Sequence, residues 1–459
     1  MKSYTEFLIE KEIKDKSSGF EVEIKTLNPM LFDWQKVLVR WSLIRGRAAL
    51  FEDCGLGKGL QQIEWAKVVS KHEQGPVMIL APLAVAEQMV SEGEKFKTTV
   101  NLCKTQADIK DGVNVTNYEK MHKFDFSAFP GVSCDESGIL KHFSSATRNE
   151  IIEMAKIVPF RLAATATPAP NDHGELGNHA EYLGVMTRSE MLSTFFVNDT
   201  SDTGTWRLRG HVQDNIFWKW MSSWAVMMTK PSDLGYDDDG FILPAIHYHE
   251  TILKSKAKPK KGFYQTQVTD LNDRRRVRRE TMDERCQAVA DLVNASDEGW
   301  LVWCELNPEG ELLHKLIPGS IEVAGRHSDD VKTERLMGFA KGKYRKLVTK
   351  PKIAGHGMNF QVCRNAAVVG LTDSWESMYQ FVRRIWRFGQ KREVNIHIFM
   401  EEREGPIIRN IREKDKRAQD MIKNMIIHTK ELTRTEILSA KRENVDYFPQ
   451  EKMRLPRWI

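Results

Sequence analysis

The stretch Ala49–Lys67, ALFEDCGLGKGLQQIEWAK, is typical of a buried strand followed by a glycine-rich turn and an amphipathic helix. Gly55 and Gly57 allow the backbone to turn tightly, so that its N–H groups can point at phosphate oxygens. The helix that follows directs the positive end of its dipole to the same place. We therefore predict a phosphate-binding loop, from which the side chain of Lys58 reaches the terminal phosphates of a nucleotide.

This loop departs from the strict pattern G-x-x-x-x-G-K-[ST], because Glu52 occupies the first glycine position and Gly59 the hydroxyl position. Taken alone, the stretch could equally be a strand-to-helix turn that binds nothing. A hydroxyl at position 59 would normally hold Mg²⁺, and with glycine a water can take its place. We expect nucleotide binding to survive and hydrolysis to be slow, so that Gly59→Thr would raise turnover.

Short apolar runs alternate with longer amphipathic stretches in two parts of the chain, which is typical of parallel sheets covered by helices. The strands predicted in the first part are Ala48–Phe51, Val77–Ala81, Val113–Thr116, Val132–Cys134 and Phe160–Ala164. Those predicted in the second part are Leu301–Cys304, Ser320–Val323, Lys346–Thr349, Ala366–Gly370 and Val394–Phe399. Helices are predicted between them, for example Leu60–Lys71 and Ser145–Lys156. We expect an α/β fold with two lobes in tandem.

The stretch between the two lobes has a different composition. Its tryptophans are Trp206, Trp218, Trp220 and Trp224, whose spacing favours a place in the core over ligand binding. Residues 254–279 then bring five lysines and five arginines, which form either a solvated linker or a surface that follows a nucleic-acid backbone. The expected parts are an N-terminal lobe at 1–185, a helical, Trp-rich insert with a basic linker at 186–285, a C-terminal lobe at 286–402 and a charged helical tail at 403–459.

Two carboxylates follow directly after a predicted strand in VSCDESG (132–138). Alone, an Asp-Glu pair is commonplace and usually belongs to a solvated turn. This pair, however, follows a phosphate loop by some eighty residues within the same alternating unit, which favours a functional role. Asp135 would hold Mg²⁺, and Glu136 would orient and deprotonate an attacking water.

Taken together, these segments resemble superfamily 2 helicases, specifically the SWI/SNF remodeller-type branch, in a compact form like those of bacteriophages. The segments that carry the resemblance are DCGLGKGLQ (53–61), VMILAPLAVAEQMVSEGEKF (77–96), VTNYEKM (115–121), DESGILKHF (135–143), LAATATPAPN (162–171), TKPKIAGHGMNFQ (349–361) and QFVRRIWRFGQKREV (380–394). They stand in the family's order and cover about residues 30–185 and 300–400. The resemblance implies two RecA-like lobes, ATP and Mg²⁺ as cofactors, and DNA as partner.

The resemblance also assigns roles to single residues. Arg384 and Arg387 stand three apart, on one face of a helix, and match arginine fingers that reach across the lobes to the γ-phosphate. With Lys58, Asp135 and Glu136 they complete the predicted catalytic set. The residues predicted to bind ATP are Gln35, Gly55, Leu56, Gly57, Lys58, Gly59 and Gln380. Those predicted to contact nucleic acid are Pro82, Leu83, Tyr118, Thr165, Thr167, Gly355 and Asn359. Gly138, Arg383 and Trp386 depart from the family's pattern.

Bulk properties limit the remaining alternatives. The net charge of +5 over 459 residues is too small to prove a nucleic-acid partner, and no apolar run is long enough for a membrane helix. Six scattered cysteines favour a reducing cytoplasm, which would be the host's if a phage encodes the chain. We expect a DNA-stimulated ATPase that translocates on DNA, with duplex favoured and single strands possible. A weakly hydrolysing, nucleotide-gated DNA clamp is the alternative. A P-loop enzyme for small molecules is disfavoured, and a nuclease or replication partner stays open.

Overall fold

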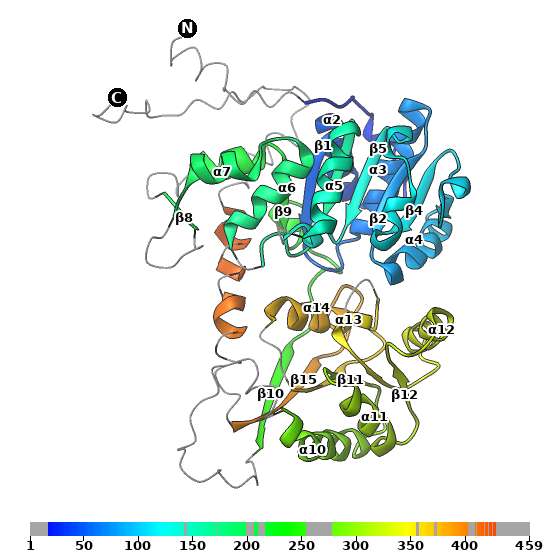
Figure 1. Cartoon of the computed structure of the whole chain (residues 1–459), viewed down its shortest axis with the longest axis vertical. Coiled ribbons are helices and arrows are strands. Elements are labelled where there is room, and N and C mark those ends of the chain that lie inside the picture. The colour runs from blue at the N-terminus through cyan, green and yellow to red at the C-terminus, as the bar shows by residue number, and fades with distance from the viewer. Residues whose placement is uncertain are drawn as a thin grey trace.

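The computed structural model consists of two α/β lobes, one above the other in Figure 1. It describes residues 17–141, 145–170, 172–198, 206–209, 216–253, 278–354, 358–370, 374–402, 409, 411–416, 418–420, 422–424, 426 and 427. The expected basic segment lies almost wholly outside the described residues, and so does Gly355. No described helix is long and apolar enough to cross a membrane.

The first lobe is built on a seven-stranded sheet in which every pairing is parallel. Its order is β3 (Val100–Leu102), β4 (Val113–Asn117), β2 (Val77–Ala81), β5 (Gly131–Asp135), β6 (Phe160–Ala164), β1 (Arg47–Glu52) and β9 (Ala225–Met228). The central strands β2, β5 and β6 are buried at every position. Burial on both faces explains why these strands are nearly continuous apolar runs in the sequence.

Helices cover both faces of this sheet and form a separate core on each. One core contains α2 (Asp33–Arg45), α3 (Lys58–Glu73) and α4 (Leu83–Lys95). The other contains α5 (Ala146–Ile157), α6 (Leu176–Leu183), α7 (Arg188–Phe195) and α8 (Ile216–Ser222). A short antiparallel pair, β7 (Phe196–Asn198) and β8 (Trp206–Leu208), lies beyond α7. The 3₁₀ turns of the lobe are η1 (Ile24–Thr26), η2 (Gln106–Asp108), η3 (Tyr118–Lys123), η4 (Phe126–Ala128), η5 (Ser137–Lys141), η6 (His173–Glu175) and η7 (Pro231–Asp233).

The second lobe repeats this plan on a six-stranded parallel sheet. Its order is β10 (Ile246–Leu253), β15 (Val394–Glu401), β14 (Asn365–Val369), β11 (Trp300–Cys304), β13 (Lys346–Thr349) and β12 (Ser320–Val323). One face packs on α10 (Met282–Asn294) and α11 (Asn307–Leu316), and the other on α12 (Asp329–Ala340) and α14 (Trp375–Ile385). The short α13 (Pro351–Ala354) and α14 lie on the side that faces the first lobe (Figure 1).

The predicted α/β fold with two parallel-sheet lobes is confirmed, and all ten predicted strands are present. The expected division of the chain differs from the structure in one respect. The segment 186–285, expected to form an insert and linker, contributes β9 to the first sheet and β10 to the second. The expected core position of Trp218, Trp220 and Trp224 is confirmed, since all three are buried against the first sheet.

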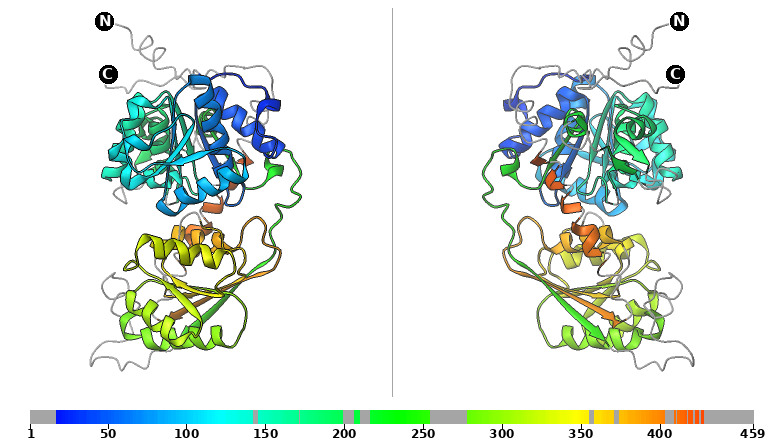
Figure 2. Two further views of the ribbon diagram at one scale, coloured as in Figure 1. Left: turned by 90° about the vertical axis from the view of Figure 1, so that its right-hand side faces the viewer. Right: turned by 90° about the vertical axis from the view of Figure 1, so that its left-hand side faces the viewer.

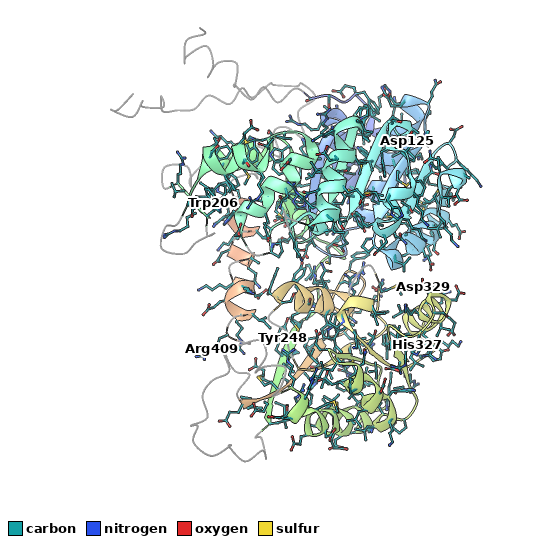
Figure 3. The ribbon with its side chains drawn as sticks, viewed as in Figure 1. Asp125, Trp206, Tyr248, His327, Asp329 and Arg409 are labelled. Carbon is teal, nitrogen blue, oxygen red and sulfur yellow. The ribbon has the colours of Figure 1, made fainter. Side chains whose placement is uncertain are left out.

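Two segments connect the lobes. The chain between η7 and β10 crosses from one lobe to the other on one side of the molecule (Figure 2). Among the described residues of the tail, Ile411 packs against the second lobe, whereas Ile422 and Ile426 pack against the first. Arg412 forms an ion pair with Glu250 on β10, on the side where Figure 3 shows Tyr248 and Arg409.

Candidate functional site

The phosphate loop joins the buried strand β1 to the N-terminus of α3. Gly55 (φ +90°) and Gly57 (φ +81°) adopt backbone conformations that favour glycine, as the sequence predicts. A Cβ on Gly55 would lie 2.9 Å from the backbone nitrogen of Phe388, so the second lobe closes directly over this loop. Lys58 begins α3, and its Nζ donates to the carbonyl oxygens of Glu52 (2.8 Å) and Asp53 (3.1 Å). The lysine is therefore held inside the loop where a phosphate would lie.

The carboxylate pair lies at the carboxyl end of β5, beside the loop. Asp135 accepts a hydrogen bond from Gln62 of α3 (2.6 Å), and its carbonyl oxygen accepts one from the Tyr118 hydroxyl (2.6 Å). Burial, followed by the charge of Glu136, raises the pKa of Asp135 to about 7. Glu136 has φ +49°, a strained conformation for a side chain other than glycine. Strain of this kind is typical of functional sites.

Both predicted fingers belong to the second lobe and approach the carboxylate pair. Nη2 of Arg384 lies 4.0 Å from Oε1 of Glu136 and donates to Oε1 of Gln380 at 2.5 Å. Arg384 and Arg387 each donate to the carbonyl oxygen of Met358 at 3.4 Å. Burial and the neighbouring Arg384 lower the pKa of Arg387. Two guanidinium groups so close together favour an anion between them.

A second set of contacts ties the loop to the same helix of the second lobe. Arg383 forms an ion pair with Asp53 (2.5 Å) and donates to the carbonyl oxygen of Cys54 (3.0 Å). The Tyr379 hydroxyl also donates to Asp53. Burial acts to lower the pKa of Arg383, but Asp53, Tyr379 and Cys54 together outweigh it and raise that pKa above its usual range. These contacts hold the two lobes together across the loop.

One cavity of about 380 Å³ gathers these elements from both lobes. Its charged lining residues are Lys58, Glu92, Lys95, Asp135, Glu136, Arg384 and Arg387. Its apolar end consists of Met30, Phe32, Phe96, Phe241 and Phe388. The rings of Phe241 and Phe388 stack with centroids 4.7 Å apart. A cavity with a charged end and an aromatic end fits a molecule built in the same way, and a nucleoside triphosphate is one.

Gln35 also lines this cavity, next to its aromatic end. Its Nε2 donates to the carbonyl oxygen of Leu56 (2.8 Å), and its Oε1 accepts from the backbone of Phe32 (2.9 Å). In this arrangement the amide connects α2 to the phosphate loop. The cavity thus contains every residue predicted to bind ATP except Gln380, which lies behind Arg384 and orients it.

Solved structures share this arrangement of two lobes. S. cerevisiae Dbp5 bound to RNA and ADP BeF3 aligns over 83% of this chain and 89% of its own, with a TM-score of 0.52 and 10% identity. The Sulfolobus solfataricus SWI2/SNF2 ATPase core in complex with dsDNA aligns over 91% and 99%, with a TM-score of 0.41 and 16% identity. No protein-family model and no curated protein sequence matches the chain. The chain therefore shares with Dbp5 a fold of two parallel-sheet α/β lobes in tandem. At these identities the likeness concerns the fold alone.

Within this fold, the residues predicted to contact nucleic acid do not form one surface. Pro82 precedes α4, and Leu83 is 42% exposed beside it. Tyr118, Thr165 and Thr167 are buried, and their contacts are internal: Tyr118 supports Asp135, and Thr165 accepts from the backbone of Thr167 (3.2 Å). Buried side chains of this kind can act on nucleic acid only through the elements they position. Asn359 is half-buried and caps the backbone of Gln361 (3.1 Å).

The structure also places residues at the site that sequence reasoning did not select. They are Asp53, Gln62, Glu92, Phe241, Tyr379 and Phe388. Asp53, Glu92 and Phe388 lie within the segments that carry the resemblance, and Tyr379 directly precedes one of them, so their position in the chain was a usable signal. Phe241 lies in the segment between the lobes, where nothing in the sequence points to a nucleotide.

Proposed function

We propose that this chain is an ATP hydrolase that uses closure of its two lobes to move along DNA, as a SWI/SNF remodeller-type translocase. The observation that carries the proposal is the shared cavity, because a phosphate loop, a carboxylate pair, the buried Arg384 and the half-buried Arg387 meet there from different lobes. A P-loop enzyme for small molecules is disfavoured because Arg384 and Arg387 come from a second parallel-sheet lobe. The compact, bacteriophage-like form is part of this proposal.

Each residue has a task in the proposed reaction. Lys58 exchanges its two loop carbonyls for the phosphates, and Glu136 orients and deprotonates the attacking water. Arg384 and Arg387 bind the γ-phosphoryl oxygens, whose charge spreads in the transition state. Aromatic rings at the apolar end hold the base.

Asp135 is the residue that fits a metal ion, since its buried carboxylate ends β5 and lines the cavity beside the loop. Mg²⁺ bound with the nucleotide would neutralise charge on the phosphates. The described residues contain no preformed group of three His, Cys, Asp or Glu side chains suited to a metal. This agrees with a Mg²⁺ site that the nucleotide's own oxygens complete.

DNA is the proposed partner, with duplex at least as effective as single strands. Dbp5, which shares the fold, was captured with RNA and a nucleotide, so RNA must be tested beside DNA. A cytoplasmic location is proposed on the six cysteines, all of which are free thiols.

The test is ATP turnover by the whole chain without nucleic acid and with single-stranded DNA, duplex DNA or RNA. We expect duplex DNA to stimulate turnover, and the apparent affinity for DNA to fall steeply with salt. Lys58→Ala should abolish turnover and weaken ATP binding, whereas Glu136→Gln should abolish turnover and leave ATP binding intact. Equal turnover with and without nucleic acid would refute the motor. ATP-gated DNA binding with negligible turnover would favour the clamp.

A further inference from the structure

Position 59, where the phosphate loop lacks its usual hydroxyl, faces the carboxylate of Glu92. A Cβ built on Gly59 would lie 2.9 Å from Oε2 of Glu92, closer than real Cβ atoms approach an oxygen. The oxygen of a neighbouring helix thus lies beside the place that a serine or threonine side chain would fill. Glycine at this position leaves room for that carboxylate.

Glu92 belongs to the nucleotide cavity. It lies on α4, is half-buried, and lines the cavity together with Lys58, Asp135 and Glu136. Gln88, one turn earlier on the same helix, donates to its Oε1 at 2.5 Å, which fixes the carboxylate and directs Oε2 toward the loop. Its negative charge acts on Asp135 of the first lobe and on Arg387 of the second. Glu92 therefore lies near the site residues of both lobes.

A carboxylate in this place is unfavourable for a nucleotide alone. The phosphates carry several negative charges, and like charges a few ångströms apart in a half-buried site repel strongly. A divalent cation between carboxylate and phosphate reverses the sign of this interaction. Mg²⁺ prefers oxygen ligands and is bound through one or two carboxylates plus substrate phosphates.

We propose that Glu92 supplies, from α4, the oxygen ligand for nucleotide-bound Mg²⁺ that the loop lacks at Gly59. This inference rests on the proposed ATP binding and deepens it. Glu92 and Asp135 then approach the metal from two different elements, α4 and β5. Glycine at position 59 suits this arrangement, because a side chain there would make the Glu92 carboxylate shift from its present place. The expectation from sequence, a water in place of the hydroxyl and faster turnover in Gly59→Thr, is the alternative to this proposal.

The test is equilibrium binding of a non-hydrolysable ATP analogue to the whole chain, measured by calorimetry at a series of Mg²⁺ concentrations and in EDTA. For Glu92→Gln we expect the Mg²⁺ concentration for half-maximal binding to rise about tenfold or more. In EDTA the same variant should bind the analogue more tightly than the unchanged chain, because one repelling charge is gone. If Glu92 had only a structural role, Glu92→Gln would weaken analogue binding both with Mg²⁺ and in EDTA, and that result would overturn the proposal.

The matched control is Glu94→Gln, an exposed carboxylate two residues further along α4. It removes the same charge from the same helix outside the cavity, so its Mg²⁺ dependence should equal that of the unchanged chain. If Glu92→Gln also equals the unchanged chain, Glu92 is no metal ligand although ATP binding stands. If the unchanged chain binds no analogue with Mg²⁺, the proposed function fails together with this inference.

A second pair of variants tests the exchange between the two positions. In Glu92→Ala, adding Gly59→Thr should restore the Mg²⁺ dependence, lowering the half-maximal concentration about tenfold, because a hydroxyl now has room beside the metal. With Glu92 present, Gly59→Thr should change the half-maximal Mg²⁺ concentration little, because the threonine hydroxyl takes the place of the Glu92 carboxylate at the metal. An equal effect of threonine in both backgrounds would show that the positions act independently and would contradict the proposal.

Discussion

Glu52 is a carboxylate in an environment where glutamate is rarely found, the interior of a sheet. It ends β1 as a fully buried carboxylate, and Gln61 donates to its Oε2 at 2.8 Å. Burial raises the pKa of Glu52 to about 7, although the Lys58 charge and the Gln61 hydrogen bond oppose the shift. Folding therefore favours the protonated form. The stability that this group contributes is full below its unfolded pKa of about 4.5 and is lost as the pH rises through 7.

Glu52→Gln should remove this pH dependence. Relative to the unchanged chain, we expect the variant to gain roughly 2 kcal/mol of unfolding free energy between pH 5 and pH 8, since each pKa unit corresponds to about 1.4 kcal/mol. Denaturant unfolding at the two pH values measures the difference. Glu119→Gln, at an exposed position, serves as control and should show no such gain. A gain of equal size at both pH values would contradict a buried, protonated Glu52.

Arg384 and Arg387 should matter to the reaction rate far more than to ATP affinity, because their charge acts on the transition state. Arg384→Ala and Arg387→Ala should each lower kcat on the order of 10³-fold, while the Kd for ATP changes about tenfold or less. Steady-state turnover and equilibrium binding measure the two quantities separately. Lys391→Ala, an exposed cation just beyond the pair, is the control. Loss of DNA affinity alone, with kcat unchanged at saturating DNA, would show that the fingers are wrongly assigned.

At the scale of elements, burial on both faces made most strands predictable. The predicted bounds of Val77–Ala81, Phe160–Ala164, Ser320–Val323 and Lys346–Thr349 match β2, β6, β12 and β13. The strands that sequence reasoning missed lie at or next to sheet edges, where the apolar signal is weak. β3 has three residues, β9 has four, and most side chains of β10 are exposed. β9 also follows directly after the tryptophan-rich α8 in the chain, and the sequence pattern assigned that whole stretch to an insert.

The tryptophans around β9 give this edge its stability. Trp224 is fully buried and lies edge-on to Phe51 of β1, with ring centroids 6.1 Å apart. Its carbonyl oxygen accepts a hydrogen bond from the backbone N–H of Ala49 (2.8 Å). We expect Trp224→Ala to lower the unfolding free energy by about 3–5 kcal/mol, because a large cavity remains beside β1. Trp206→Ala, at a half-exposed position of β8, should lower it by roughly 1 kcal/mol or less. Equal losses in a denaturant titration would place Trp224 outside the core.

The site was predictable where one element carries its chemistry and less so where two elements meet. The loop, the carboxylate pair and the two arginines each occupy a short segment, so spacing along the chain reveals them. Glu92 gains its place only because α4 packs beside α3, and no sequence pattern reports that Gly59 faces it. Tyr118 shows the converse: its motif position predicts a nucleic-acid contact, and the fold adds a contact that the motif does not predict, from its hydroxyl to the backbone carbonyl of Asp135.

At the scale of the whole molecule, the two lobes touch across the phosphate loop. Arg383 and Tyr379 on α14 bind Asp53, and the rings of Phe241 and Phe388 stack at the other end of the cavity. Arg383 is 4% exposed, so separating the lobes would bring a buried ion pair into water. Breaking such a pair by removing one partner costs about 3–5 kcal/mol, because the remaining charge is left buried and uncompensated.

Arg383→Ala should therefore shift the nucleotide-free chain toward separated lobes. With Arg383 gone, Asp53 keeps hydrogen bonds from the Tyr379 hydroxyl and the Cys54 backbone N–H but has lost its cation. Because the Asp53 carboxylate is better solvated when the lobes part, the radius of gyration from small-angle X-ray scattering should increase. The double variant Asp53→Ala, Arg383→Ala leaves no uncompensated charge and should be closer to the unchanged chain than Arg383→Ala alone. ATP analogue with Mg²⁺ should close all three proteins, since the fingers Arg384 and Arg387 remain. Exposed Arg392 on the same lobe provides the control variant Arg392→Ala. Identical scattering from Arg383→Ala and the unchanged chain would show that the ion pair between Arg383 and Asp53 does not stabilise the closed arrangement of the lobes.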